Sequence, residues 1–267
     1  MLLADGSDGR GRAHPRRESY YNCAVTLVLA GLVVLAAAFV KGAIAFGFPT
    51  LGTPLLSLVT DVKTAVVVLI LPNIAMDGIQ FARQGAPRTI VDRFWTLLVT
   101  GAIGTVIGTR LLADLSPRTA SLVLSLFILL FVAVSVSGRA PRVSRVSERW
   151  VSPLVGLVVG VIGGVTNVHG TPLVMYFVAL GLAKHDFVAA VSFTFVVYKL
   201  VQLGAVAYFG LLSGSLMLWS VVLTLVALGG FAAGLRVQDR LDPRSFRRAT
   251  LGFLAVLGTW LLVRSVR

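Results

Sequence analysis

The phrase Gly-Thr-Pro-Leu occurs twice in this sequence, at 52–55 and at 170–173, and each copy interrupts a long apolar stretch. Inside a lipid bilayer a chain must satisfy its own backbone polar groups, so such an interruption is costly. Threonine followed by proline is typical of a helix start, because the hydroxyl can cap free N–H groups and proline needs no donor in the first turn. The phrase therefore predicts that two helices begin within the membrane, at Thr53 and Thr171.

The composition indicates a membrane protein, since 57% of the 267 residues are hydrophobic and only 13% are charged. Apolar segments at 53–60 and 171–183 are too short to cross about 30 Å of hydrocarbon, whereas most of the others are long enough. We therefore predict an all-α polytopic membrane protein, embedded in a lipid bilayer, in which the two short segments are half-helices.

The net charge of +13 is carried largely by short connections at 83–93, 139–149 and 236–248. Short basic loops are what orients membrane spans, so this charge does not indicate a nucleic-acid partner. The single cysteine, Cys23, excludes an intramolecular disulfide.

The two halves of the chain match each other. Adding 118 to residues 42 and 52–55 gives 160 and 170–173, and adding 122 takes Gln80 to Gln202. A shift of 126 relates Gly104, Gly108 and Arg110 to Gly230, Gly234 and Arg236. Internal duplication in membrane proteins is typical of transporters, and the Gly-x-x-x-Gly pairs predict close helix packing. We predict a disordered tail at 1–22, repeat 1 at 23–138, a basic connection at 139–150 and repeat 2 at 151–267.

Equivalent loops carry opposite charge bias. The connection at 83–93 has three arginines and its counterpart near 205–215 has none, whereas 113–118 is nearly neutral and 237–248 has four arginines. This difference favours inverted repeats. The four arginines of the N-terminal tail argue for parallel repeats, so both arrangements stay open.

Three charged residues lie well inside apolar segments: Lys41, Asp77 and Lys199. Ionisable residues are expensive in a bilayer and mark a pathway, a binding site or an ion pair. Asp77 and Lys199 occupy the same repeat position, so we expect them to meet across the pseudo-symmetry axis. The three charges sum to +1, which favours one bound anion.

Polar side chains continue from these charges along two helix faces. Asn73, Asp77 and Gln80 are spaced i, i+4, i+7, and Lys199 with Gln202 forms the matching face in the other half. Two readings stay open: interhelical hydrogen bonding, or a shared cavity with coupling or gating by Lys41, Asn73, Asp77, Gln80 and Gln202.

We call the interruptions around 52–55 and 170–173 the first and the second break. They supply hydroxyl, amide and backbone donors, which suit an oxyanion. With Lys199, the predicted substrate-binding residues are Thr50, Gly52, Thr53, Asn167, His169, Gly170 and Thr171. His169 has no second histidine or carboxylate at ligand spacing, so we expect no metal site, and the residue is either a donor to substrate, a proton carrier or structural. With no nucleotide-binding loop and no Ser-His-Asp set, we predict neither an enzyme nor a cofactor.

The duplicated Gly-Thr-Pro-Leu, the polar-lined span after it and the Gly-x-x-x-Gly-x-Arg segment ending in Leu-x-Pro resemble the TauE/SafE family of sulfite and organosulfonate exporters, over residues 24–264. The resemblance implies a secondary transporter of small anions in the bacterial cytoplasmic (inner) membrane. It directs attention to Gly52-Thr53-Pro54 and Gly170-Thr171-Pro172. Phe46, Phe48 and Pro49 replace the Gly164, Thr166 and Asn167 of the second half, which questions equal contributions of the breaks.

We therefore predict a transporter of sulfite, an organosulfonate or a related organic anion that works by alternating access between two repeats. The coupling ion would be a proton or sodium. The alternatives are a carrier of another small solute and a membrane-embedded protein without transport. The oligomeric state is open, a homodimer included.

Overall fold

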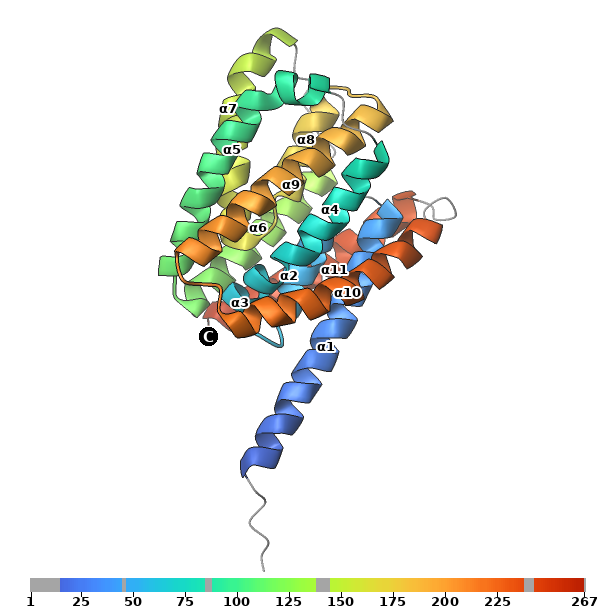
Figure 1. The fold of residues 1–267 in the computed structure, drawn as a ribbon. Coiled ribbons are helices and arrows are strands. Elements are labelled where there is room, and N and C mark those ends of the chain that lie inside the picture. The colour runs from blue at the N-terminus through green and yellow to red at the C-terminus, as the bar shows by residue number, and fades with distance from the viewer. Residues whose placement is uncertain (1–14, 45–46, 85–87, 138–144, 238–242, 267) are drawn as a thin grey trace, which may run out of the picture.

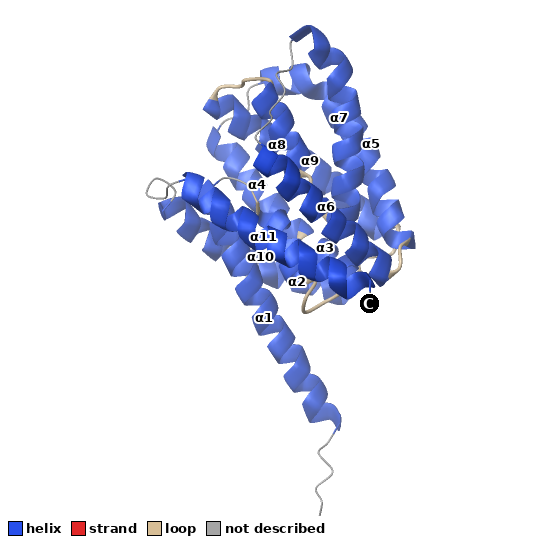
Figure 2. Cartoon of the chain, turned by 180° about the vertical axis from the view of Figure 1, so that it is seen from behind, coloured by secondary structure: helices blue, strands red, loops and turns tan. Residues whose placement is uncertain are grey.

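The computed structural model describes residues 15–44, 47–84, 88–137, 145–237 and 243–266, and every regular element within them is a helix (Figures 1 and 2). In chain order these are α1 (Pro15–Ile44), α2 (Phe48–Leu56), α3 (Val62–Val68), α4 (Ile70–Gln84), α5 (Arg88–Asp114), α6 (Pro117–Ser137), α7 (Arg145–Thr166), α8 (Gly170–Ala179), α9 (Lys184–Tyr208), α10 (Gly214–Val237) and α11 (Pro243–Val266). Seven helical stretches of the described chain are long and apolar enough to cross a membrane. The predicted all-α polytopic membrane protein is confirmed.

Some helix boundaries differ from the sequence-based expectations. Helix α1 begins at Pro15, inside the predicted tail, and α7 begins at Arg145, inside the predicted connection. Residues 1–14 and 138–144 lie outside the described residues. The apolar segment at 64–82 is divided between α3 and α4. Pro72 has no N–H for the Val68 carbonyl, which instead accepts a hydrogen bond of 2.8 Å from Ser220 Oγ of α10.

Glycines bring two pairs of helices into backbone contact. A Cβ at Gly104 of α5 would lie 2.4 Å from the Leu157 carbonyl oxygen of α7, and one at Gly234 of α10 would lie 2.1 Å from the Phe39 carbonyl oxygen of α1. Neither position has room for a side chain. The Gly-x-x-x-Gly segments therefore have the close-packing role that the sequence predicts.

The same contacts give an alignment of α1 with α7, the first long helices of the two predicted repeats. Gly104 meets Leu157 where Gly230 meets Leu35, and Gly108 meets Val161 where Gly234 meets Phe39. Both comparisons give a shift of 122 residues (157 − 35 and 161 − 39), not the 118 that aligns Gly42 with Gly160. In the alignment by packing, Gly42 is equivalent to Gly164. The alignment by sequence makes it equivalent to Gly160, which lies one helical turn earlier.

Helices at equivalent places in the two predicted repeats pack against each other in opposite directions. In α4 and α9, the rings of Phe81 and Phe193 lie 5.0 Å apart at one end, and Ile70 packs with Val206 at the other. In α6 and α11, Arg118 Nε donates to the Ser265 carbonyl oxygen at 2.7 Å, and Gly258 faces Ile128. Figure 1 shows the antiparallel course of α4 and α9.

Candidate functional site

The chain reverses inside the bundle between α7 and α8. Helix α7 ends at Thr166, and Asn167 follows with φ 68°, the left-handed value that non-glycine residues rarely adopt. His169 stands at the N-cap position of α8, without a side-chain capping bond. The break predicted before Pro172 is therefore present, and it directs the N-terminus of α8 into buried surroundings.

A chain of hydrogen bonds joins this break to the first one. Lys199 Nζ of α9 donates to Asn167 Oδ1 and, at 2.6 Å, to Gln202 Oε1. Asn167 Nδ2 then donates to Thr53 Oγ1 of α2 at 3.2 Å. All of these side chains are buried. We call Thr53, Asn167, His169, Lys199 and Gln202 the central polar cluster.

The side-chain amide of Gln202 is held by the end of α7 and accepts a hydrogen bond from the Lys199 ammonium group. Its Nε2 lies 3.3 Å from the carbonyl oxygens of both Gly163 and Gly164, near the end of α7. The amide oxygen of Gln202 is thereby turned toward Lys199. The ammonium group donates to two neutral side-chain amides and, at 3.4 Å, to the Asn167 backbone carbonyl oxygen, and it has no carboxylate partner among the described residues.

A buried ion pair lies beside the cluster. Lys41 Nζ of α1 and Asp77 Oδ1 of α4 are 2.6 Å apart, and neither side chain is more than 1% exposed. The expectation that Asp77 pairs with Lys199 is wrong, because Lys41 bonds the carboxylate and Asn167 and Gln202 occupy the ammonium group of Lys199. Asp77 and Lys199 interact only as charges at a longer distance. The second carboxylate oxygen, Asp77 Oδ2, has no hydrogen-bond partner in the described structure.

The imidazole of His169 is buried against bare backbone. A Cβ at Gly163 would lie 2.0 Å from His169 Cδ2, so only glycine leaves room for the ring. Tyr198 and Phe195 face it, with ring centroids 5.7 and 6.4 Å away. The Asn167 backbone is a polar neighbour, but neither ring nitrogen completes a hydrogen bond with a described residue. A buried group of this kind is a place for a ligand or a water molecule.

The two breaks differ in where their helices begin. Thr53 and Pro54 lie inside α2, which starts at Phe48 after Gly47, so the prediction that Thr53 caps a helix is wrong. Pro49 fits the first turn and moves the start upstream. Helix α8 does begin at the phrase, at Gly170. The side chain of Thr171 lies outside the described residues.

Other predicted residues are placed around the cluster. Thr50 is buried, and its Oγ1 would lie 4.0 Å from a Cβ at Gly170, so the two breaks approach each other here. Gly52 faces Leu69 and Ala37 instead, away from the cluster. Asn73, Asp77 and Gln80 are all buried on α4, and Asn73 Nδ2 bonds its own helix at the Leu69 carbonyl.

Two aromatic residues of this region were missed by sequence reasoning. The ring centroid of Phe195 lies 5.7 Å from Lys41 Nζ. Beside His169, Tyr198 Oη donates to the Leu97 carbonyl oxygen at 2.7 Å. Both share the face of α9 that carries Lys199 and Gln202, at spacing i, i+3, i+4, i+7. That spacing is visible in the sequence, but aromatic residues within an apolar span do not stand out. The described residues contain no group of three or more His, Cys, Asp or Glu that could hold a metal ion.

Comparison with known proteins identifies a family. A family model described as "Sulfite exporter TauE/SafE" matches residues 29–261, which is nearly the whole chain. No curated protein and no solved structure matches.

Proposed function

Since the chain belongs to the sulfite exporter TauE/SafE family, we propose that it carries sulfite, an organosulfonate or a related organic anion across the cell inner membrane by alternating access. The family is one of membrane transporters of sulfite or related anions. The finer assignment rests on one observation, the buried ammonium group of Lys199, whose partners among the described residues are all neutral oxygen atoms.

Charge balance supports an anion as substrate. Lys41 and Asp77 neutralise each other, and Lys199 is then the remaining charge of the three that lie well inside apolar segments. An unpaired charge in a membrane interior is expensive. An anion bound beside Lys199 would complete the pair, whereas a cation would add to the repulsion.

The donors around Lys199 define where the anion would bind. Helix α8 has unpaired backbone N–H groups at its N-terminus, where the helix dipole favours negative charge. His169 stands at that terminus with both ring nitrogens available. Asn167 Oδ1 occupies the place on Lys199 that an oxyanion oxygen would take, so we propose that substrate displaces this amide.

Two inverted repeats would supply the alternating access. The antiparallel packing of α4 with α9 and of α6 with α11 supports inversion, because an in-plane twofold pseudo-axis reverses each helix relative to its equivalent. The Lys41–Asp77 pair and Lys199 lie on or beside α4 and α9, which is where the two halves would rock against each other.

The Lys41–Asp77 pair is our candidate for coupling. Asp77 Oδ2 is buried and without a partner, so it offers a site for a proton or a sodium ion. Flux measured in proteoliposomes under an imposed proton gradient, and separately under a sodium gradient, identifies which ion drives transport.

The test of function is Lys199→Met, which keeps the length of the side chain and removes its charge. Purified protein in proteoliposomes should transport sulfite, and the variant should lose at least nine-tenths of that flux. Lys63→Met is the matched control, since Lys63 lies on α3 and bonds the Ala113 carbonyl, outside the cluster. Folded wild-type protein that carries no sulfite or sulfonate, or normal flux in the Lys199 variant, would overturn the proposal.

A further inference from the structure

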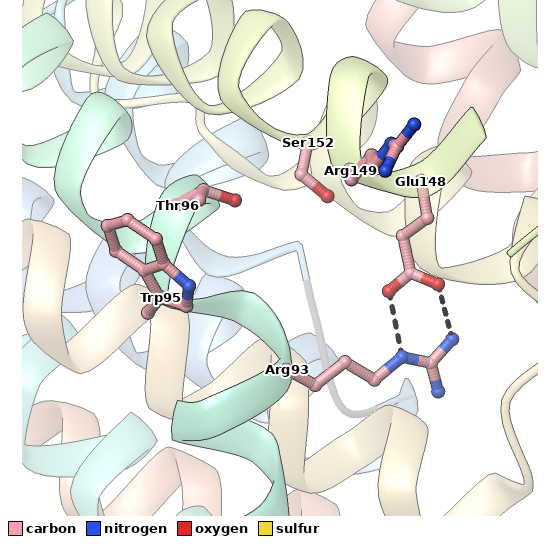
Figure 3. A pocket seen from close by; sticks show the side chains of 6 residues that line it. All are labelled: Arg93, Trp95, Thr96, Glu148, Arg149 and Ser152. Atoms are coloured by element: carbon pink, nitrogen blue, oxygen red, sulfur yellow. Dashed lines mark hydrogen bonds and ion pairs between the residues drawn. The ribbon is translucent and has the colours of Figure 1, made fainter. Parts of the chain in front are cut away.

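A second polar site lies where α5 and α7 begin. A cavity of about 350 Å³ is lined by Arg93, Trp95, Thr96, Glu148, Arg149 and Ser152 (Figure 3). Glu148 is near the start of α7 and Asn167 follows its end. At 1.5 Å per residue, about 25 Å of helix axis separates this cavity from the central polar cluster. The two sites are therefore distinct.

An ion pair gives the cavity its shape. Arg93 Nε donates to Glu148 Oε1 at 2.7 Å, and Arg93 Nη2 donates to Glu148 Oε2 at 2.8 Å (Figure 3). This paired geometry holds the guanidinium plane, and no described residue bonds its third nitrogen, Nη1. Arg149 has no carboxylate partner in the described chain and lies over the Trp150 ring. The three charged groups sum to +1.

The surroundings of the cavity resemble a membrane boundary. Trp95 and Trp150 are 60% and 72% exposed, and tryptophan is enriched at the level of lipid headgroups. Further along the same two helices, exposed apolar side chains follow, namely Val99, Ile103, Leu154 and Val158. The cavity therefore has donors at the headgroup level and an apolar surface where acyl chains lie.

We propose that this cavity binds the headgroup of an anionic phospholipid. Arg93 Nη1 and Arg149 bind the phosphate, Thr96 and Ser152 line the cavity beside the headgroup, and the acyl chains lie along the exposed faces of α5 and α7. The basic connections at 83–93 and 139–149 support a position at the cytoplasmic surface, where anionic lipids gather near arginine and lysine. A free anion would leave the adjoining apolar surface unused.

The experiment compares two lipids with the same acyl chains, phosphatidylglycerol and phosphatidylcholine, added to the full chain purified in detergent. Thermal unfolding followed by tryptophan fluorescence should show a larger rise in Tm with phosphatidylglycerol. In Arg149→Gln that difference should fall by at least half, and the apparent affinity for phosphatidylglycerol should fall about tenfold. Arg149 is exposed, so the variant is expected to fold, which size-exclusion chromatography checks.

Arg110→Gln is the matched control. Arg110 is an exposed arginine of α5 that pairs with Asp114, and this variant should keep the full lipid response. Equal responses to the two lipids, an unchanged response in Arg149→Gln, or a loss in Arg110→Gln as large as in Arg149→Gln would overturn the proposal. A response to inorganic phosphate as large as that to phosphatidylglycerol would also overturn it, because it would indicate a site for a small anion.

Discussion

The two breaks contain the same four residues, yet the phrase leaves a backbone carbonyl group without its donor in one helix and backbone N–H groups without acceptors in the other. In α2 the phrase lies in the helix interior, where Pro54 has no N–H and leaves the Thr50 carbonyl without its usual donor four residues later. In α8 the phrase opens the helix and leaves backbone N–H groups unpaired. At the phrase itself α2 thus offers an acceptor and α8 offers donors, and donors are what attract an anion.

The residues before the phrase account for the difference. Gly47, with φ 102°, turns the chain so that Pro49 can occupy the first turn of α2. In the second half Asn167 makes the turn, and no proline occurs until Pro172. The same four residues therefore take a different place in each helix because of the residues that precede them, and we propose that the anion binds at the second break.

The largest effect is expected from a charge placed in the second break. Asn167→Asp sets a carboxylate on Lys199 where we expect the substrate, so two anions would compete for one ammonium group. Losing a hydrogen bond to a charged group costs about 1.5–3 kcal/mol, which corresponds to roughly a tenfold to hundredfold loss of sulfite affinity. Titration calorimetry on folded protein measures this.

Asn167→Gly is the control for the backbone, since glycine adopts φ 68° without strain and adds no charge. It should bind sulfite within about tenfold of wild type, on the same hydrogen-bond scale. If Asn167→Asp binds sulfite as well as the wild type does, the anion does not sit on Lys199 and the assignment to the second break is wrong.

A smaller effect is expected from crowding the breaks with one methyl group each. In Gly163→Ala the new Cβ would lie 2.0 Å from His169 Cδ2, so the ring must move, and overpacking of this kind costs about 1–3 kcal/mol. In Gly52→Ala the nearest atom is Leu69 Cδ1 at 3.4 Å, a tolerable contact within α2. Thermal unfolding and sulfite titration should show loss for Gly163→Ala and little change for Gly52→Ala. Similar losses in both variants would show that the two breaks are equally constrained.

Local patterns predicted the helices and the polar faces, because helical spacing depends only on nearby residues. Asn73, Asp77 and Gln80 are buried along α4 as their spacing predicts. Partner choice depends on how distant helices pack, and no spacing rule shows that Lys41 of α1 reaches Asp77. The alignment of α1 with α7 by packing differs from their alignment by sequence for the same reason, since the contacts of α1 with α10 and of α7 with α5 decide it.

Helix starts were predicted correctly only where no stronger signal stood nearby. Thr-Pro marks the beginning of α8, but in α2 the earlier Pro49 takes the first turn and the same Thr-Pro becomes interior. His169 was predicted as a substrate-binding residue, with a proton-carrier or structural role left open, whereas the space that Gly163 leaves for its ring comes from packing between helix ends. The sequence therefore identified the residues of the cluster better than their contacts.

The smallest expected effect comes from the first break, at Thr53→Val. Thr53 Oγ1 accepts a hydrogen bond of 3.2 Å from Asn167 Nδ2, and valine keeps the shape while removing the acceptor. A neutral hydrogen bond contributes about 0.5–1.5 kcal/mol, so sulfite affinity should fall roughly two- to tenfold, less than in Asn167→Asp. Thr53→Ser keeps the hydroxyl and should be milder.

Thr109→Val is the control, because that buried hydroxyl bonds the Thr105 carbonyl of its own helix, and sulfite affinity should be unchanged. A loss at Thr53→Val as large as that in Asn167→Asp would mean that the first break holds the anion directly, and the contrast between the breaks would fail.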